Sequence, residues 1–86
     1  MIVLFYGSVL DFTNGEKLLN INDCSSIRTL IDKLSGQYGK NFEDFLLGNE
    51  TCFFLVNGKG IMMTGGLDTI LKPGDKIEVL PFTEAG

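Results

Sequence analysis

One amphipathic segment decides what this chain can fold into. Between residues 27 and 34, apolar side chains recur at positions i, i+3, i+4 and i+7, which places them on one face of a helix. These apolar residues are Ile27, Leu30, Ile31 and Leu34. Ser25 or Ser26 can cap the first amides of the helix, and Gly36 or Gly39 can end it with a positive φ. A helix with one apolar face needs a second layer of structure to cover that face.

The segments before the helix have the composition of strands. Residues 2–6, IVLFY, are continuously apolar, which predicts a central strand covered on both faces. The Asn-Gly pair at 14–15 predicts a hairpin turn, because both residues tolerate a positive φ. The following KLLNIN is typical of the returning strand, with Leu18 as its first apolar contact and Leu19 and Ile21 as further candidates.

The second half of the chain alternates turn signals with short apolar runs. KNFEDFLL, bounded by Gly48, predicts a short second helix or a turn. TCFFLVNGKGIMMT predicts two strands joined by an Asn-Gly turn at 57–58, with one of Met62 and Met63 pointing inward. Residues 67–71 predict a short helical turn.

The last strand comes after a tight turn. Pro73-Gly74 marks the turn, and we expect Asp75 to shape it through hydrogen bonds from its side chain to the backbone. KIEVL then alternates, so that Ile77 and Val79 point inward. With apolar first and last strands side by side, the order of elements predicts an α+β fold of the β-grasp, ubiquitin-like type. It has a mixed sheet of four to five strands with one main helix packed across it.

Size and charge restrict the class of protein. The 86 residues fit one domain, expected at residues 1–82, followed by a flexible C-terminal tail at residues 83–86. With a net charge of −4, the chain lacks the excess of positive charge that nucleic-acid binding needs, whereas an acidic surface suits a basic protein partner. The first residues show no basic n-region and no small-residue cleavage site, so we expect no signal peptide, and the apolar runs are too short to span a bilayer. We therefore expect a cytoplasmic protein that does not bind membranes.

Little in the sequence is suited to catalysis or metal binding. The chain has no histidine, which excludes Cys–His catalysis and histidine-based metal sites. Cys24 and Cys52 are not at a metal-ligand spacing, and we expect both to be reduced, with at least one buried. Gly65-Gly66 is not a phosphate loop, because no Lys-Ser/Thr follows at the required spacing. We predict a protein that is not itself an enzyme, with no catalytic residue, metal site or bound cofactor.

Four segments, taken in order along the chain, have counterparts in one family. MIVLFYGSVLDFTNGEK stands where that family has its apolar first strand and the loop after it, and SIRTLIDKL stands at its helix. FLVNGK is similar to its valine-asparagine strand and turn, and LKPGDKIEVLPF to its last turn and strand. The ordered set resembles the ubiquitin-like sulfur carriers of the ThiS/MoaD family, and most of all the small subunit of molybdopterin synthase.

The resemblance implies that the chemistry is carried at the C-terminus. In this family an ATP-using enzyme of the E1 type adenylates the terminal carboxylate, and sulfur then replaces the AMP to give a thiocarboxylate. The matching position here is Gly86, which has no Cβ and therefore fits a narrow channel. The residues expected to enter the partner's site with it are Phe82, Thr83, Glu84 and Ala85.

The same resemblance implies the partners. They are an E1-like adenylating enzyme that binds the ATP, a sulfurtransferase or cysteine desulfurase, and the large subunit of molybdopterin synthase. The sulfur on Gly86 would pass to a pterin precursor of molybdenum or tungsten cofactor. Family members dock their partners through an apolar sheet surface. The candidates for that surface are Phe53, Phe54, Leu55, Met62 and Met63, although the plainer interpretation of Phe53–Leu55 is a strand with one face in the core.

Two positions depart from the family pattern. Ala85 stands where the family usually has a glycine before the terminal one, and Phe82 where it often has a second proline. Alanine adopts a positive φ only at a cost, so an activating enzyme that needs that conformation would reject this tail. Two alternatives therefore stay open. One is a ubiquitin-like modifier that is joined to lysines of other proteins, and the other is a β-grasp interaction module that is not conjugated at all.

Overall fold

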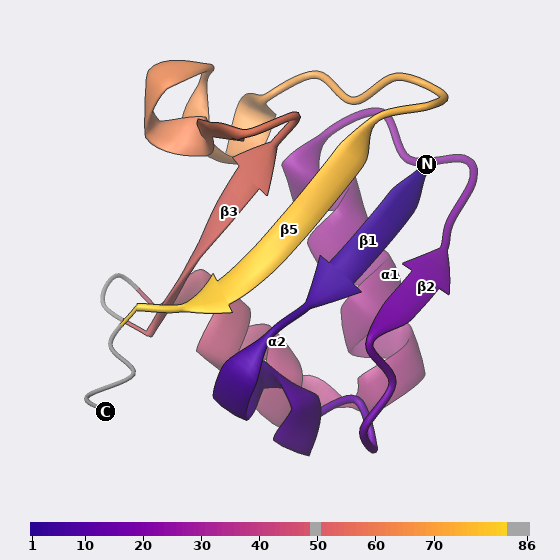
Figure 1. Cartoon of the computed structure of the whole chain (residues 1–86), viewed down its shortest axis with the longest axis vertical. Coiled ribbons are helices and arrows are strands. Elements are labelled where there is room, and N and C mark those ends of the chain that lie inside the picture. The colour runs from indigo at the N-terminus through magenta and orange to yellow at the C-terminus, as the bar shows by residue number, and fades with distance from the viewer. Residues whose placement is uncertain (49–50, 83–86) are drawn as a thin grey trace.

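The computed structural model describes residues 1–48 and 51–82, which form one mixed sheet with two α-helices on one of its faces (Figure 1). The strand order is β2-β1-β5-β3-β4, with β1 and β5 parallel and the other neighbours antiparallel. The elements are β1 (Ile2–Phe5), β2 (Leu18–Asn20), α1 (Ile27–Tyr38), α2 (Lys40–Leu47), β3 (Cys52–Val56), β4 (Lys59–Gly60) and β5 (Lys76–Pro81). The last strand lies beside the first, and the predicted β-grasp architecture is confirmed.

Strand β1 lies inside the sheet as predicted, but only one of its faces is covered. Val3 and Phe5 point toward the helices and are buried, whereas Ile2 is exposed and Leu4 is half-buried. Side chains alternate between the two faces of a strand, and both helices lie on the same face here. The expectation that both faces are covered is therefore wrong, and the second half of the apolar run contributes to an uncovered face.

The segment between β1 and β2 holds more structure than the predicted hairpin turn. Residues Gly7–Asp11 form a 3-10 helix that buries one valine in the core. Residues 14–15 adopt the positive φ values expected of the turn, 57° and 82°. Leu18 lies opposite Leu4 on the uncovered face and is exposed, whereas Leu19 and Ile21 pack against the core.

Helix α1 begins at a cap and packs its apolar stripe against the sheet. The hydroxyl of Ser26 accepts a hydrogen bond from the backbone N–H of Thr29 at 3.2 Å, and the Thr29 hydroxyl accepts one from the backbone N–H of Ser26 at 3.0 Å. This reciprocal pair is a capping box. Gly39, with a φ of 106°, ends the helix. The buried stripe is the predicted one, Ile27, Leu30, Ile31 and Leu34.

Replacing Ser26 with alanine is expected to lower the free energy of unfolding by about 1 kcal/mol. The change removes the side-chain acceptor of the Thr29 N–H and leaves the apolar face of α1 intact. Urea unfolding followed by circular dichroism measures the loss. Ser25→Ala is the matched control, because the Ser25 side chain lies outside the capping box. Equal losses in the two variants would show that Ser26 is not the cap.

Helix α2 follows at once and adds an aromatic cluster to the core. Phe42 is fully buried and stacks on Phe12, with the ring centroids 5.2 Å apart. Phe5 and Tyr38 meet the Phe42 ring edge-on, at centroid distances of 6.1 and 5.7 Å. The predicted second helix before Gly48 is confirmed, and Phe42 joins it to both α1 and β1.

The chain leaves the sheet soon after β3. The Asn-Gly turn at 57–58 is confirmed by φ values of 52° and 85°, but β4 is only two residues long. Ile61–Met63 form a 3-10 helix where a strand was predicted. The short helical turn predicted at 67–71 is found as a 3-10 helix at Gly66–Asp68, so it begins one residue earlier and is shorter than predicted. Met62 and Met63 are 91% and 87% exposed. The prediction of one inward methionine is therefore wrong, because this segment lies beyond the end of the sheet (Figure 1).

The turn before β5 is shaped by Asp75, as predicted. Its carboxylate accepts hydrogen bonds from the backbone N–H of Lys72 at 2.8 Å and from the Nδ2 of Asn57 at 2.9 Å. These bonds, the one from Asn57 first, lower the pKa of the Asp75 carboxyl below its ordinary value. Beyond this turn, Ile77 and Val79 point into the core and are fully buried, as predicted.

Candidate functional site

The predicted tail lies beyond the last described residue, Phe82. The four tail residues lie outside the described residues and are Thr83, Glu84, Ala85 and Gly86. Phe82 itself is held in place, because its backbone N–H donates to the carbonyl of Thr51 at 2.9 Å and continues the ladder between β3 and β5. Four residues span at most about 14 Å. Any site that takes up the carboxylate of Gly86 must therefore come within about that distance of Phe82.

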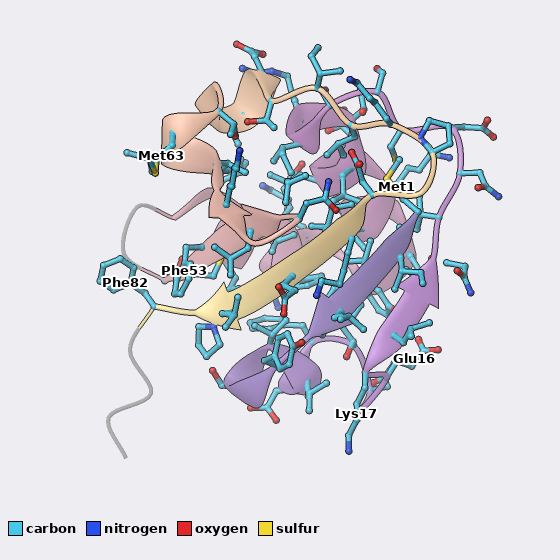
Figure 2. The ribbon with its side chains drawn as sticks, turned by 45° about the horizontal axis from the view of Figure 1, so that its top comes forward. Met1, Glu16, Lys17, Phe53, Met63 and Phe82 are labelled. Carbon is cyan, nitrogen blue, oxygen red and sulfur yellow. The ribbon has the colours of Figure 1, made fainter. Side chains whose placement is uncertain are left out.

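Two aromatic rings meet at the point where the tail begins. Phe53 on β3 and Phe82 have ring centroids 6.2 Å apart and nearly perpendicular planes, and Figure 2 shows them side by side at the end of β5. Phe53 is 38% exposed and Phe82 is 52% exposed. Each ring therefore packs on the other and also offers surface to solvent.

The sheet face opposite the helices carries apolar side chains on four strands. We call this surface the open face. Its positions alternate with the buried ones along each strand, and the register places Leu18 opposite Leu4 and Phe53 opposite Leu80. The apolar residues of the open face are Ile2, Leu4, Tyr6, Leu18, Phe53, Leu55 and Leu80.

The five residues predicted for a partner-binding surface are divided by the structure. Phe53 and Leu55 lie on the open face. Phe54 is 2% exposed and points toward the helices, because neighbours along a strand face opposite sides, so its assignment to a surface is wrong. Met62 and Met63 are exposed, but they belong to the 3-10 helix beyond β4 and not to the sheet. Figure 2 shows Met63 there.

An apolar groove of about 370 Å³ runs along the outer edge of β3. Strand β4 pairs only with Leu55 and Val56, so no strand among the described residues covers that edge at Cys52–Phe54. The groove adjoins the aromatic pair at the base of the tail. Its lining residues include Leu46, Leu47, Phe53, Ile61, Met62 and Phe82.

The two cysteines are placed as predicted, both free and both buried. Cys52 lines the groove, where burial raises the pKa of its thiol to about 11. Burial also raises the pKa of the Cys24 thiol. A thiol with so high a pKa stays protonated near neutral pH and is a poor nucleophile. The groove therefore offers apolar binding surface and not a reactive sulfur.

One polar pair stands in the middle of the open face. The Tyr6 hydroxyl donates to Oε2 of Glu78 at 2.8 Å, and this hydrogen bond raises the pKa of Tyr6. Sequence reasoning named neither residue for the site. The alternation in KIEVL was a usable signal for Glu78, since it places this residue opposite Ile77 and Val79. The position of Tyr6 depends on the parallel pairing of β1 with β5, which no local pattern reveals.

The described part of the chain offers few groups for other kinds of site. Within residues 1–48 and 51–82, no three His, Cys, Asp or Glu side chains are grouped so that they could hold a metal ion. None of the described helices has the length and apolar character needed to cross a membrane. The open face and the groove, by contrast, are apolar surfaces next to each other at the base of the tail, and such surfaces are suited to protein docking.

The fold has close counterparts among solved structures. CysO of Mycobacterium tuberculosis, described as an antigen, superimposes with a TM-score of 0.82 at 20% identity, covering 95% of this chain and 98% of that one. The small archaeal modifier protein 1 of Methanosarcina acetivorans gives a TM-score of 0.79 at 20% identity, covering 99% of this chain and 94% of that one. A putative molybdopterin converting factor, subunit 1, of Pyrococcus furiosus gives a TM-score of 0.71 at 20% identity, with 95% of each chain covered.

At these identities the solved structures establish the fold alone. No curated protein was matched by the sequence. The profile of the ThiS family matches residues 3–84, which is nearly the whole chain. The chain therefore belongs to the ThiS family, the ubiquitin-like sulfur carriers that its sequence resembles.

Proposed function

We propose that this carrier transports sulfur on Gly86 for the biosynthesis of molybdopterin. The observation that carries the proposal is the family match, which runs through β5 and into the tail as far as residue 84. A carboxylate oxygen of Gly86 attacks the α-phosphorus of ATP, and pyrophosphate leaves. A sulfur nucleophile then attacks the acyl carbon, and AMP leaves with the electrons of the broken C–O bond. Because the attacking sulfur is the outer atom of a persulfide on the sulfur donor, the first product is an acyl disulfide. A thiol then attacks the donor's sulfur atom, the S–S bond to the acyl sulfur breaks, and the thiocarboxylate on Gly86 is released while the donor is left in a disulfide.

In this scheme the carrier supplies a reachable carboxylate, and its partners supply the catalysis. ATP binds to an E1-like adenylating enzyme, and the carrier itself binds no cofactor. The sulfur comes from a sulfurtransferase or a cysteine desulfurase. The short reach from Phe82, about 14 Å at most, requires the enzyme to dock against the same end of the sheet. The open face and the aromatic pair of Phe53 and Phe82 are the surface for that docking.

The destination of the sulfur is the finer part of the proposal. The sequence resemblance favours the small subunit of molybdopterin synthase, and a protein of similar fold is named a putative molybdopterin converting factor. The large synthase subunit would then receive the tail and pass the sulfur to a pterin precursor, in the cytoplasm. A second candidate is a ubiquitin-like modifier, which the name of the similar archaeal modifier protein favours.

Intact-mass measurement tests the proposal directly. The protein is incubated with ATP, a sulfur source and the adenylating enzyme of its own organism. We expect a mass gain equal to the exchange of one oxygen for sulfur, and we expect a variant that lacks Gly86 to show no gain. Higher bands on a denaturing gel of the same organism's extract would favour the modifier.

If no mass gain is found, the methyl group of Ala85 is one possible cause, and the variant Ala85→Gly tests it. If the enzyme is active on another carrier and converts Ala85→Gly but not the wild-type protein, the Ala85 methyl blocks adenylation. The sulfur-carrier proposal would then be wrong for this chain, and the interaction module would take its place.

A further inference from the structure

The centre of the open face holds a charge that the sheet itself does not explain. Glu78 lies on β5, the middle strand of the five. Its cross-strand neighbours are Leu4 on β1 and Leu55 on β3, and Leu80 follows it on the same face. Glutamate is disfavoured in strands, and these three neighbours give it no polar contact. These apolar neighbours therefore do not account for a carboxylate at this position, and its one hydrogen-bond partner among residues 1–48 and 51–82 is Tyr6.

The Glu78 carboxylate is oriented but not neutralised. The Tyr6 hydroxyl donates to Oε2 at 2.8 Å and fixes its direction, while Oε1 has no hydrogen-bond partner among residues 1–48 and 51–82. The ion pairs found in that part of the chain all lie away from the sheet, on α1, α2 and the 3-10 helix Gly66–Asp68. Lys76 shares the open face with Glu78 but forms no ion pair with it.

We propose that the adenylating enzyme docked on the open face presents an arginine to Glu78. This inference rests on the proposed function and specifies the chemistry of its docking partner. A protein that covers Leu4, Leu55 and Leu80 also removes water from the carboxylate between them. An ionised carboxylate is costly to bury without a cation beside it. The partner surface that fits is therefore apolar with one positive charge at its centre.

An arginine fits this position better than a lysine. Its planar guanidinium offers two parallel N–H donors to the two oxygens of one carboxylate. The Tyr6 hydrogen bond holds that carboxylate in one orientation, so less side-chain freedom is lost when the pair forms. The net charge of −4 on the chain also favours approach by a basic surface.

The test compares wild-type protein with Glu78→Gln. The purified adenylating enzyme of the same organism is titrated with each full-length carrier by calorimetry, and ATP–pyrophosphate exchange is followed as the carrier concentration is varied. Glutamine keeps the shape of the side chain and can still accept from Tyr6, but it carries no charge. We expect Kd and the KM for the carrier to rise at least about tenfold, with kcat at saturation unchanged.

Two further variants sharpen the comparison. Tyr6→Phe leaves the charge in place and removes only the hydrogen bond that orients it, so we expect a smaller rise in Kd, roughly two- to fivefold. Asp32→Asn is the matched control, because it changes the net charge by the same amount on the exposed side of α1. It is expected to bind like the wild-type protein.

The outcomes separate the two proposals. If the wild-type carrier is adenylated and Glu78→Gln binds equally well or more tightly, no cation meets Glu78 and the present inference is overturned. The same holds if Asp32→Asn weakens binding as much as Glu78→Gln does, since the effect is then one of net charge. If the wild-type carrier is not adenylated at all, the proposed function is overturned and the inference falls with it.

Discussion

Replacing Phe42 with alanine is expected to lower the free energy of unfolding by about 3–5 kcal/mol. Phe42 is fully buried, and its ring contacts those of Phe5, Phe12, Tyr38 and Phe45. The truncation removes apolar surface from the core and leaves a cavity between α2, α1 and β1, which close packing allows to collapse only in part. A domain of this size has a total stability of roughly 4–13 kcal/mol. The loss would therefore be a large part of the whole, and urea unfolding measures it.

A matched control and a second variant keep this prediction testable. Leu47→Ala removes an exposed apolar side chain from the same helix, and we expect it to change the unfolding free energy by less than about 0.5 kcal/mol. If Phe42→Ala is too unstable to fold, Phe42→Leu retains most of the apolar volume and should lose about 1–2 kcal/mol, chiefly from the aromatic contacts. A loss below about 1 kcal/mol in Phe42→Ala would mean that the ring is not packed as described.

The features that could be predicted from the sequence are those that local physics decides. The stripe on α1 and its serine cap depend on spacing within one segment, and both are found. The Asn-Gly turns at 14–15 and 57–58 need only a positive φ at two adjacent residues. The inward positions Ile77 and Val79 follow from the two-residue period of a strand.

The features that were missed depend on contacts between distant segments. The sequence of β1 is equally apolar on both faces, so only the position of the helices decides that Ile2 is exposed. The run that contains Met62 and Met63 has the composition of a strand, and nothing local signals that the chain leaves the sheet there. The bond between Tyr6 and Glu78 joins residues 72 positions apart, and it exists only because β1 and β5 are neighbours.

Replacing Phe53 with alanine is expected to raise the Kd for the adenylating enzyme about 10- to 100-fold. Phe53 lies on the open face at the base of the tail, and under the proposed function an enzyme that takes up Gly86 makes contact there. A rigid, partly exposed aromatic side chain is the kind of residue that carries much of the binding energy of an interface. Titration calorimetry measures the change, and urea unfolding of the same variant measures its cost to the fold, expected to be about 1 kcal/mol.

Phe53 also contacts Phe82, so its loss can act through the position of the tail as well as through the interface. A double-mutant cycle with Phe82→Ala separates these two effects. If the rings act independently, the changes in binding free energy of the two single variants add up to that of the double variant. If the rings act as one surface, the double variant loses less than that sum. Ile70→Ala controls for lost apolar area, since Ile70 is exposed but lies outside the open face. If Ile70→Ala and Phe53→Ala weaken binding equally, the open face is not the docking surface. If only the phenylalanine variants weaken binding, the enzyme binds the end of the sheet from which the tail begins.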